Sequence, residues 1–583
     1  MRKTFYFSLA AANVKRSREV YVPYFIVAAV ISGVYFLILG MIFSPGLTNL
    51  PGGETAQTVF IMGICLFTVF AYLFMLYVNA FLVKRRKKEF GLYSVLGMNR
   101  RQVARVLMWE NLVVIGAGTV AGILIGCVFG RLLFMLLMRM LHAAAGSTFR
   151  LPFVAFAGTF ALLFAVFASA SLYNGVRIRV TDTAELLRSD HAGEKRQRAV
   201  VPTAVLGALL LAGAYYVALT ADEVSVAISF FFPAAMVVII ATFLLFSSGS
   251  TAFLRLLRRC KRIYYKPENF IAISSMLHRM RQNARGLAVI CVFSTMLIVT
   301  VAGTSSLYLG QEEILRANYP YDVRMSLSPA EEGADLTEIV DFPAVDRELG
   351  ELAAKYGVTL SASADKLVDE ADAPEFNPGK IVRRKNSQFL QLQNAIVLDR
   401  MLMLDVGGDD AQAEAFADAF KIYMSHAYGD VAAPRMSAIY DARTEGYAVY
   451  GGLLFLGAFF GVLFLAVTVI MIYFKQITEG QEDKERFSIL QKVGMRDIDV
   501  KRTIDRQILW VFFLPLIGAL MHVLAASRMI AKMLEGFALY NTGLTLNCVL
   551  AASAVFALVY LLVYRQTAGV YYRMVRRQPE RTE

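Results

Sequence analysis

Residues that could do chemistry are few in this sequence, and they are scattered along it. There is no Gly-x-x-x-x-Gly-Lys-Ser/Thr run to hold nucleotide phosphates, no Gly-x-Ser-x-Gly elbow and no His-Glu-x-x-His motif. The cysteines form no C-x-x-C pair, and no His-rich cluster suggests a metal. We therefore expect no catalytic, cofactor-binding or metal-binding residues in this chain. We interpret the five histidines as packing or interfacial residues: His142, His191, His278, His426 and His522.

One basic cluster has the chemistry to bind an anion. Arg383, Arg384 and Lys385 stand together in an otherwise acidic stretch. Basic side chains of this kind form charge-assisted hydrogen bonds to phosphate oxygens, so the cluster is a candidate contact for a pyrophosphate group. The simpler alternative, which we favour, is a solvated surface loop.

A second charged pattern occurs twice. Each copy begins with Lys-Glu, continues with an apolar-patterned helical turn or two, and ends in Gly-Met. A glycine is apt to stop a helix, methionine is an adaptable contact residue, and the glutamate could anchor to a basic partner group. The defining residues are Lys88, Glu89, Gly97 and Met98 in the first copy and Lys484, Glu485, Gly494 and Met495 in the second.

The repeated pattern predicts a short polar helix that docks a soluble motor. A stiff helix beside a membrane span can pass the motion of another protein into the membrane. The alternative is a pair of amphipathic helices on the inner leaflet, with Lys84–Lys88 bound to anionic lipid. Two copies between equivalent spans favour docking.

The elements that must position these helices are membrane spans. The chain has 583 residues, is 57% hydrophobic and has a mean hydropathy of +0.53, which is too apolar for a soluble protein of this size. Apolar runs of about 20 residues recur, and each can cross a hydrocarbon core. The predicted spans cover about 23–43, 58–83, 107–131, 151–173, 200–220, 225–250, 286–309, 446–474, 508–530 and 547–564.

Charge predicts the orientation. The stretch 310–445 has a net charge of −12, and the rest of the chain carries +25. The loops 44–57 and 221–224 contain no Lys or Arg, whereas the alternate loops and both termini are rich in them. By the positive-inside rule, we expect both termini and both Lys-Glu copies in the cytoplasm and 310–445 outside.

The chain also repeats at a larger scale. Phe7-Ser8-Leu9-Ala10 precedes span one, and Phe270-Ile271-Ala272-Ile273 precedes span seven. Spans one to four therefore resemble spans seven to ten as parallel repeats, with spans five and six inserted as a hairpin. We expect an all-α polytopic membrane protein of ten transmembrane helices: two four-helix units, a two-helix insert and an α+β extracellular domain.

Span three carries a glycine at every fourth position: Gly118, Gly122, Gly126 and Gly130. A glycine face lets another helix approach closely. We favour tight packing over a hinge at this face.

The hydrophilic insert 310–445 is long enough to fold alone. We expect helices over Pro343–Tyr356 and Ala411–Met424, and short strands over Gly357–Ser361 and Ile396–Leu398.

At the run Lys87–Ser94 and Leu96–Met98, the chain resembles the FtsX-like permeases of ABC transporters, most closely the bacitracin-export type. The ten-span layout, the external domain between spans seven and eight, and Tyr319-Pro320-Tyr321-Asp322 at its start carry the same resemblance. The resemblance assigns these domains: 1–198 as the first FtsX-like unit (coupling helix about 84–105), 199–254 as the hairpin, 255–309 as a basic helix with span seven, 310–445 as the extracellular domain, and 446–583 as the rest of the second unit (coupling helix about 475–506).

The resemblance implies a separate ATPase subunit that binds ATP and magnesium, mechanotransmission in place of a substrate channel, and a bacterial plasma membrane location. It implies resistance to peptide antibiotics that attack lipid-linked cell-wall precursors, with a membrane histidine kinase as signalling partner. Two alternatives stay open: mechanotransmission to an extracellular protein or lipoprotein, and a sensor scaffold for a kinase without transport.

The two coupling regions differ in charge. Region 84–105 has a net charge of +7, and region 475–506 has a net charge of +1. Two such regions on one chain match the two equivalent grooves of an ATPase dimer, so we expect one permease to bind two ATPase subunits. We expect the first site to be more sensitive to salt, because salt screens exposed charges.

Overall fold

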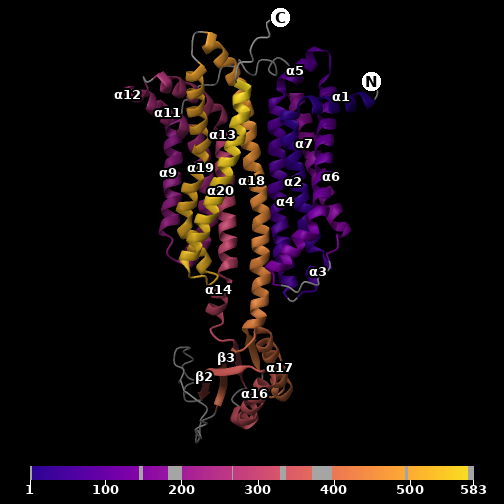
Figure 1. Cartoon of the computed structure of the whole chain (residues 1–583), viewed down its shortest axis with the longest axis vertical. Coiled ribbons are helices and arrows are strands. Elements are labelled where there is room, and N and C mark those ends of the chain that lie inside the picture. The colour runs from indigo at the N-terminus through magenta and orange to yellow at the C-terminus, as the bar shows by residue number, and fades with distance from the viewer. Residues whose placement is uncertain are drawn as a thin grey trace. The chain divides into compact units, whose positions relative to one another are not determined.

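Long apolar helices dominate the computed structural model, which describes residues 3–50, 52–142, 149–180, 200–264, 267–328, 336–369, 397–432, 434–492 and 497–575. Within these residues, ten helices are long and apolar enough to cross a membrane, which confirms the ten-span prediction. The chain divides into a helical unit, Met1–Leu309 with Val449–Glu583, and a smaller unit, Gly310–Ala448. Figure 1 shows the element labels.

The first half of the helical unit is a four-helix group. Its members are α2 (Arg18–Ile42), α4 (Gly53–Arg85), α6 (Arg100–Met140) and α7 (Phe153–Val180). Three short helices accompany them: α1 (Lys3–Arg16), α3 (Pro45–Thr48) and α5 (Lys87–Val95). The glycines of span three lie at the α2–α6 contact. A Cβ at Gly118 would lie 2.6 Å from the Cβ of Ala28, and one at Gly122 would overlap Ser32 and Gly33.

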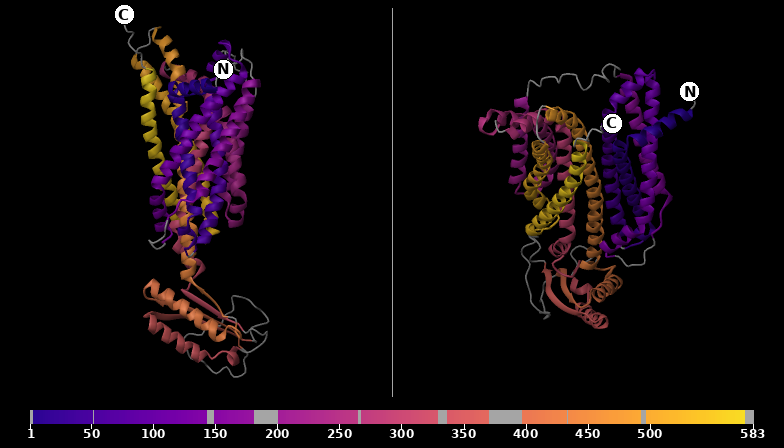
Figure 2. Two further views of the ribbon diagram at one scale, coloured as in Figure 1. Left: turned by 90° about the vertical axis from the view of Figure 1, so that its right-hand side faces the viewer. Right: turned by 45° about the horizontal axis from the view of Figure 1, so that its top comes forward.

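The second half contains a corresponding group. It comprises α13 (Pro267–Leu309), α18 (Ile439–Lys492), α19 (Asp497–Glu535) and α20 (Thr542–Val575). In the two views of Figure 2, the long helices of this unit run side by side. A seam of phenylalanine rings joins α4 to α18, with ring-centroid distances of 4.8–6.0 Å. Its pairs are Phe60–Phe455, Phe67–Phe460, Phe70–Phe464 and Phe81–Phe474.

The hairpin consists of α9 (Val200–Thr220) and α10 (Val224–Leu244), which continues through a π-helical turn, Leu245–Gly249, into α11 (Ser250–Arg259). A four-residue helix, α12 (Lys261–Tyr264), follows. His522 on α19 holds the hairpin, because its two ring nitrogens lie 2.6 Å from the Tyr215 hydroxyl and 3.0 Å from the Thr242 hydroxyl. This contact fits the interpretation of His522 as a packing residue.

The smaller unit folds around an antiparallel sheet of order β2-β3-β1-β4. The strands are β1 (Val323–Leu327), β2 (Thr359–Asp369), β3 (Val397–Gly407) and β4 (Arg435–Ala438), and the helices are α14 (Gln311–Asn318), α15 (Leu336–Ile339), α16 (Phe342–Tyr356) and α17 (Asp410–Tyr428). In β1, Val323, Met325 and Leu327 point into a core shared with Phe416 and Phe420 of α17. The α+β prediction is therefore confirmed.

The two expected strands were too short, and two strands were missed. β2 and β3 each have 11 residues, whereas the sequence predicted about three to five. β1 and β4 were not predicted. The sequence predicted too short a β2 because most of this strand consists of Ser, Ala, Asp and Lys. β2 lies at the edge of the sheet, where few apolar side chains are needed.

Asp322, the last residue of the Tyr-Pro-Tyr-Asp run, fastens the start of this sheet. Its carboxylate accepts hydrogen bonds from Arg316 on α14 at 2.8 Å and from the backbone N–H of Val406 on β3 at 2.9 Å. Its carbonyl accepts from the N–H of Ile439 at 2.9 Å. One residue thus ties the incoming and outgoing helices of the smaller unit to the central strands.

Candidate functional site

The first Lys-Glu copy forms a short, well-bounded helix. α4 ends at Arg85, and Arg86 leaves helical geometry (φ −93°, ψ 10°) before α5 begins. At the other end, the N–H of Gly97 donates to Ser94 and the N–H of Met98 donates to Tyr93, which is the Schellman pattern of helix termination. Gly97 has φ +90°, a conformation that a residue with a Cβ rarely adopts.

The next helix starts at once. Asn99 and Gln102 form a capping box, in which each side chain satisfies an unpaired N–H at the start of α6. Only Leu96 to Asn99 separate α5 from the long helix α6. These local hydrogen bonds fix the direction of α5 relative to span three.

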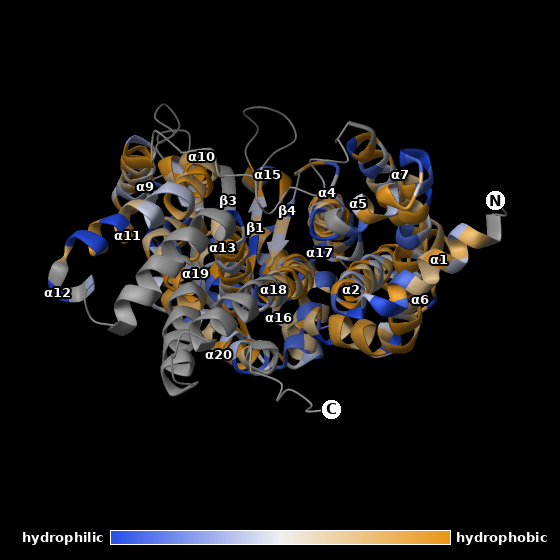
Figure 3. Cartoon of the chain, turned by 90° about the horizontal axis from the view of Figure 1, so that it is seen from above, coloured by the Kyte–Doolittle hydropathy of each residue, from blue (hydrophilic) through white to orange (hydrophobic). Residues whose placement is uncertain are grey.

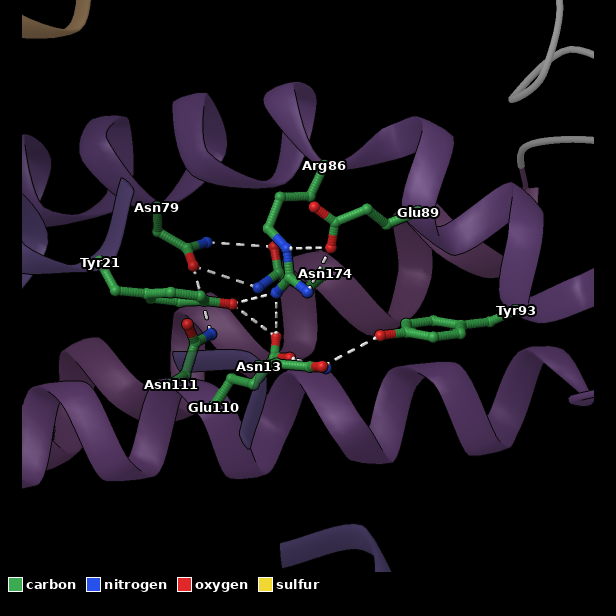
Figure 4. A network of polar contacts seen from close by, with 9 residues as sticks. All are labelled: Asn13, Tyr21, Asn79, Arg86, Glu89, Tyr93, Glu110, Asn111 and Asn174. Carbon is green, nitrogen blue, oxygen red and sulfur yellow. Dashed lines mark hydrogen bonds and ion pairs between the residues drawn. The ribbon is translucent and has the colours of Figure 1, made fainter. Parts of the chain in front are cut away.

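An almost fully enclosed ion pair holds the beginning of α5. The guanidinium of Arg86 lies 2.6 Å from the Glu110 carboxylate of α6, and each side chain is only 1% exposed. Arg86 also donates a hydrogen bond to the Tyr21 hydroxyl, which donates to Glu110 at 2.7 Å. Its guanidinium further lies over the Phe90 ring, 5.4 Å from the centroid. Figure 4 shows the contacts among Arg86, Tyr21 and Glu110.

The network extends to α1 and α5. The amide of Asn13 donates to Glu110 at 2.7 Å, and the Tyr93 hydroxyl donates to the Asn13 oxygen at 3.1 Å. Glu89 lies 2.6 Å from Arg86, with its side chain 46% exposed. Burial alone would lower the pKa of Arg86, but Tyr21, Glu110 and Glu89 raise it above its usual value, so the guanidinium stays charged.

A cluster of three buried amides lies beside the ion pair, as Figure 4 shows. Asn79 of α4 exchanges hydrogen bonds of 3.0 and 3.1 Å with Asn174 of α7, and it accepts a 3.2 Å bond from Asn111 of α6. In a membrane, an apolar side chain can contact lipid as favourably as it contacts another helix, so apolar contacts alone do not drive helices together. Hydrogen bonds between amide side chains supply an attraction between the helices that lipid does not. The base of α5 therefore rests on a polar core shared by α1, α2, α4, α6 and α7.

The outward face of α5 is apolar. Leu92, Val95 and Leu96 are 54%, 65% and 72% exposed, whereas Phe90 on the opposite face is 2% exposed. Their spacing of three and four residues puts them on one side of the helix. An exposed apolar face of this kind marks a surface for contact with another protein or with a membrane.

The predicted contact residues are placed unequally. Glu89 engages Arg86 of its own chain, with half of its side chain left for a partner. Met98 is partly buried, and Gly97 ends the helix. Lys88 lies in α5, but its side chain falls outside the described part of the structure. The sequence indicated an apolar pattern in this helix, but Leu92, Val95 and Leu96 were not predicted as contact residues, although their helical spacing was a readable signal.

The second copy does not form a separate short helix within the described residues, so that expectation was wrong. α18 runs without a break from Ile439 through Lys484 and Glu485 to Lys492. The position of Arg86 is occupied by Asp483 when the copies are aligned on Gly-Met, so the arginine that marks the break in copy one has no counterpart. The side chains of Lys484 and Glu485, and all of Gly494 and Met495, lie outside the described residues.

The candidate pyrophosphate contact, Arg383, Arg384 and Lys385, also lies outside the described residues. Over the part of the chain that the structure describes, no group of three or more His, Cys, Asp or Glu side chains could hold a metal ion.

Two segments of the chain, residues 59–182 and 458–578, each match the family described as FtsX-like permease C-terminal. The chain carries two FtsX-like permease segments. Each match contains one Lys-Glu copy, so α5 and the end of α18 occupy corresponding places in the two FtsX-like segments.

This permease is similar over nearly its whole length to other ABC transporter permeases. It is 23% identical to the uncharacterized ABC transporter permease YvcS of Bacillus subtilis (strain 168), over 97% of this chain and 99% of the relative. It is 23% identical to the permease YxdM of the same strain, over 96% and 99%. It is 21% identical to that strain's bacitracin export permease protein BceB, over 88% and 92%. The permease is therefore a multi-pass membrane protein of the ABC transporter type.

Proposed function

We propose that this permease is the membrane subunit of a bacterial ABC transporter, and that a separate ATPase docks on α5. The observation that carries the proposal is the outward apolar face of Leu92, Val95 and Leu96 on a helix whose base is locked by the Arg86–Glu110 ion pair. A force applied to this face passes to spans one and three through Tyr21 and Glu110. In this scheme ATP and magnesium bind the ATPase, and this chain supplies no cofactor site.

The second ATPase subunit docks at the end of α18, which gives one permease to two ATPase subunits. Here the coupling surface is continuous with the span, because α18 has no break before Lys492. Motion at the second site reaches the membrane directly along the helix axis. The two sites thus couple through different mechanical elements.

The permease lies in the plasma membrane with both termini in the cytoplasm and Gly310–Ala448 outside. Figure 1 supports this orientation, since α1, α5 and α11 lie at one end of the helical unit and each carries basic residues: Lys and Arg in α1, Lys in α5 and Arg in α11. By the positive-inside rule this end faces the cytoplasm.

Peptide antibiotics bound to lipid-linked cell-wall precursors are the proposed target. Two relatives are named as bacitracin export permeases. The acidic external stretch, net −12 over 310–445, suits a cationic peptide, and Arg383–Lys385 is the proposed pyrophosphate contact. A histidine kinase is the proposed signalling partner.

The test is resistance in a strain that lacks this permease, complemented with the permease alone, with its ATPase, or with an ATP-hydrolysis-dead ATPase. We expect resistance to one or more peptides only when permease and active ATPase are both present. Unchanged sensitivity across a broad peptide panel would contradict the substrate proposal and leave action on an extracellular protein. Kinase signalling that survives the dead ATPase would instead indicate a sensor scaffold.

A further inference from the structure

The segment after the hairpin has an outward face with two kinds of side chain. On α11, Phe253 and Leu256 are 55% and 62% exposed, three residues apart. Arg255 and Arg259, four residues apart, are exposed on the adjoining flank. The opposite side, with Leu254, packs on Leu287 and Ala288 of α13. The helix is therefore fixed to the bundle along one side and open along the other.

The segment between Glu223 and Glu268 carries basic residues and no acidic ones. Residues 224–266 contain Arg255, Arg258, Arg259, Lys261, Arg262 and Lys266 and no Asp or Glu. In the described part of the chain, no ion pair involves the four arginines. Arg258 lies instead over the Tyr264 ring, 5.9 Å from its centroid. The positive charge is left for a partner outside this segment.

The placement of α11 and α12 matches the edge of a bilayer. α11 continues directly from the span helix α10, so it lies where that span leaves the hydrocarbon. Figure 3 shows α11 and α12 extending outward from the bundle, with hydrophilic colour toward α12. Four arginines are too costly within hydrocarbon, and an exposed Phe–Leu pair is unfavourable in water. A helix with both features is stable at the level of the lipid headgroups, where its apolar side chains reach the acyl chains and its arginines reach the phosphates.

We propose that α11 and α12 form a binding site for the headgroups of anionic phospholipids in the bilayer around the permease. Phe253 and Leu256 insert between the acyl chains, and Arg255 and Arg259 hydrogen-bond the lipid phosphates. This site is separate from the α5 docking surface and does not depend on the transported substrate. It anchors the end of the hairpin at a defined depth.

The test uses Cys260, which is exposed between α11 and α12, as a reporter position. Full-length permease with the other four cysteines replaced is labelled at Cys260 with a polarity-sensitive fluorophore in neutral detergent. It is titrated with phosphatidylglycerol or phosphatidylcholine. We expect a blue shift that saturates at much lower phosphatidylglycerol content. Arg255→Gln/Arg259→Gln should raise the half-saturating content roughly fivefold for each arginine removed, because one basic residue near an anionic surface contributes about that factor.

Matched variants separate charge from fold. Arg255→Lys/Arg259→Lys should retain most of the preference, and Arg347→Gln/Lys355→Gln on α16 should leave it unchanged. Equal titrations with the two lipids in the parent protein would overturn the proposal even if no variant folds. A blue shift with inorganic phosphate as large as the shift with phosphatidylglycerol would also overturn the proposal. A blue shift that appears on addition of the ATPase, and not on addition of lipid, would overturn it as well.

Discussion

Arg86 stands inside the basic run Lys84–Lys88, yet its side chain is 1% exposed. Sequence alone would assign it to a solvated, positive face. The signal in the sequence comes from the partner of Arg86 in the ion pair. Glu110 is the only Asp or Glu between residues 90 and 180. A lone carboxylate at the start of a span needs a cationic partner. The choice among five consecutive basic residues still depends on the direction of the chain at the end of α4.

Glu110→Ala should destabilise the permease far more than Glu89→Ala. Removing Glu110 leaves the Arg86 charge enclosed and poorly paired, which costs about 3–5 kcal/mol, whereas the half-exposed Glu89 contributes about 1 kcal/mol or less. Thermal unfolding of the purified variants measures the difference. Arg86→Met/Glu110→Leu should recover most of the loss, since it removes both charges. Equal midpoints for the two single variants would show that the ion pair is not a structural anchor.

At the scale of the element, spans were predictable because burial in lipid demands about 20 apolar residues in a row. The strands were harder. β1 and β4 have only 5 and 4 residues, and their alternation is short enough to be missed between turns. The break between α4 and α5, against the unbroken α18, was also not readable. Both copies contain Lys-Glu and Gly-Met. They differ at the position before Lys-Glu that is Arg86 in the first copy and an acidic residue, Asp483, in the second.

Gly122→Ala should lower the unfolding midpoint and disturb the α2–α6 contact. The added methyl group would overlap Ser32 Oγ and the backbone of Ala29 and Gly33, which cannot move aside as a flexible side chain could. Overpacking of this kind costs about 1–3 kcal/mol. The control is Gly116→Ala on the same helix, where no atom lies within 4 Å of the new Cβ. A midpoint for Gly122→Ala equal to that of Gly116→Ala would contradict tight packing at this face.

Gly97→Ala should weaken ATPase binding without unfolding the permease. The substitution meets no steric contact, but a left-handed residue with a Cβ costs about 1–2 kcal/mol, so the end of α5 should unwind or tilt. We expect up to roughly tenfold weaker binding in a pull-down titration. Gly97→Asn tolerates the same backbone geometry and should bind nearly as tightly as the parent protein. If Asn and Ala behave alike, the conformation of Gly97 is not what positions α5.

At the scale of the whole molecule, two FtsX-like segments are joined in one chain but differ at their coupling regions. Copy one is a separate helix on a buried ion pair with a regional net charge of +7. Copy two is the end of a 54-residue helix with a regional net charge of +1. The duplication could be read from the sequence. The break before α5, which α18 lacks, could not be read from the sequence. It depends on a contact that involves α2, α6 and the end of α4.

The two docking sites should respond differently to salt. Leu92→Ser/Leu96→Ser impairs copy one, and the aligned Ile489→Ser/Val493→Ser impairs copy two. ATPase binding to the permease that retains only copy one should fall more steeply with added potassium chloride, because its exposed charges are screened. Equal salt dependence of the two half-impaired permeases would contradict unequal docking.

The most direct test of the central claim is the affinity of the ATPase for permease with the α5 face removed. Leu92→Ser/Leu96→Ser, on an Ile489→Ser/Val493→Ser background, leaves neither docking surface. The control is Ile422→Ser/Val431→Ser, which removes exposed apolar side chains from the smaller unit. Our account predicts loss of ATPase association and of permease-dependent ATP hydrolysis in the first protein, at unchanged thermal stability, and no change in the control. The opposite result would be a stably folded protein that carries all four serine substitutions and still binds the ATPase as tightly as the parent. That result would contradict docking through α5.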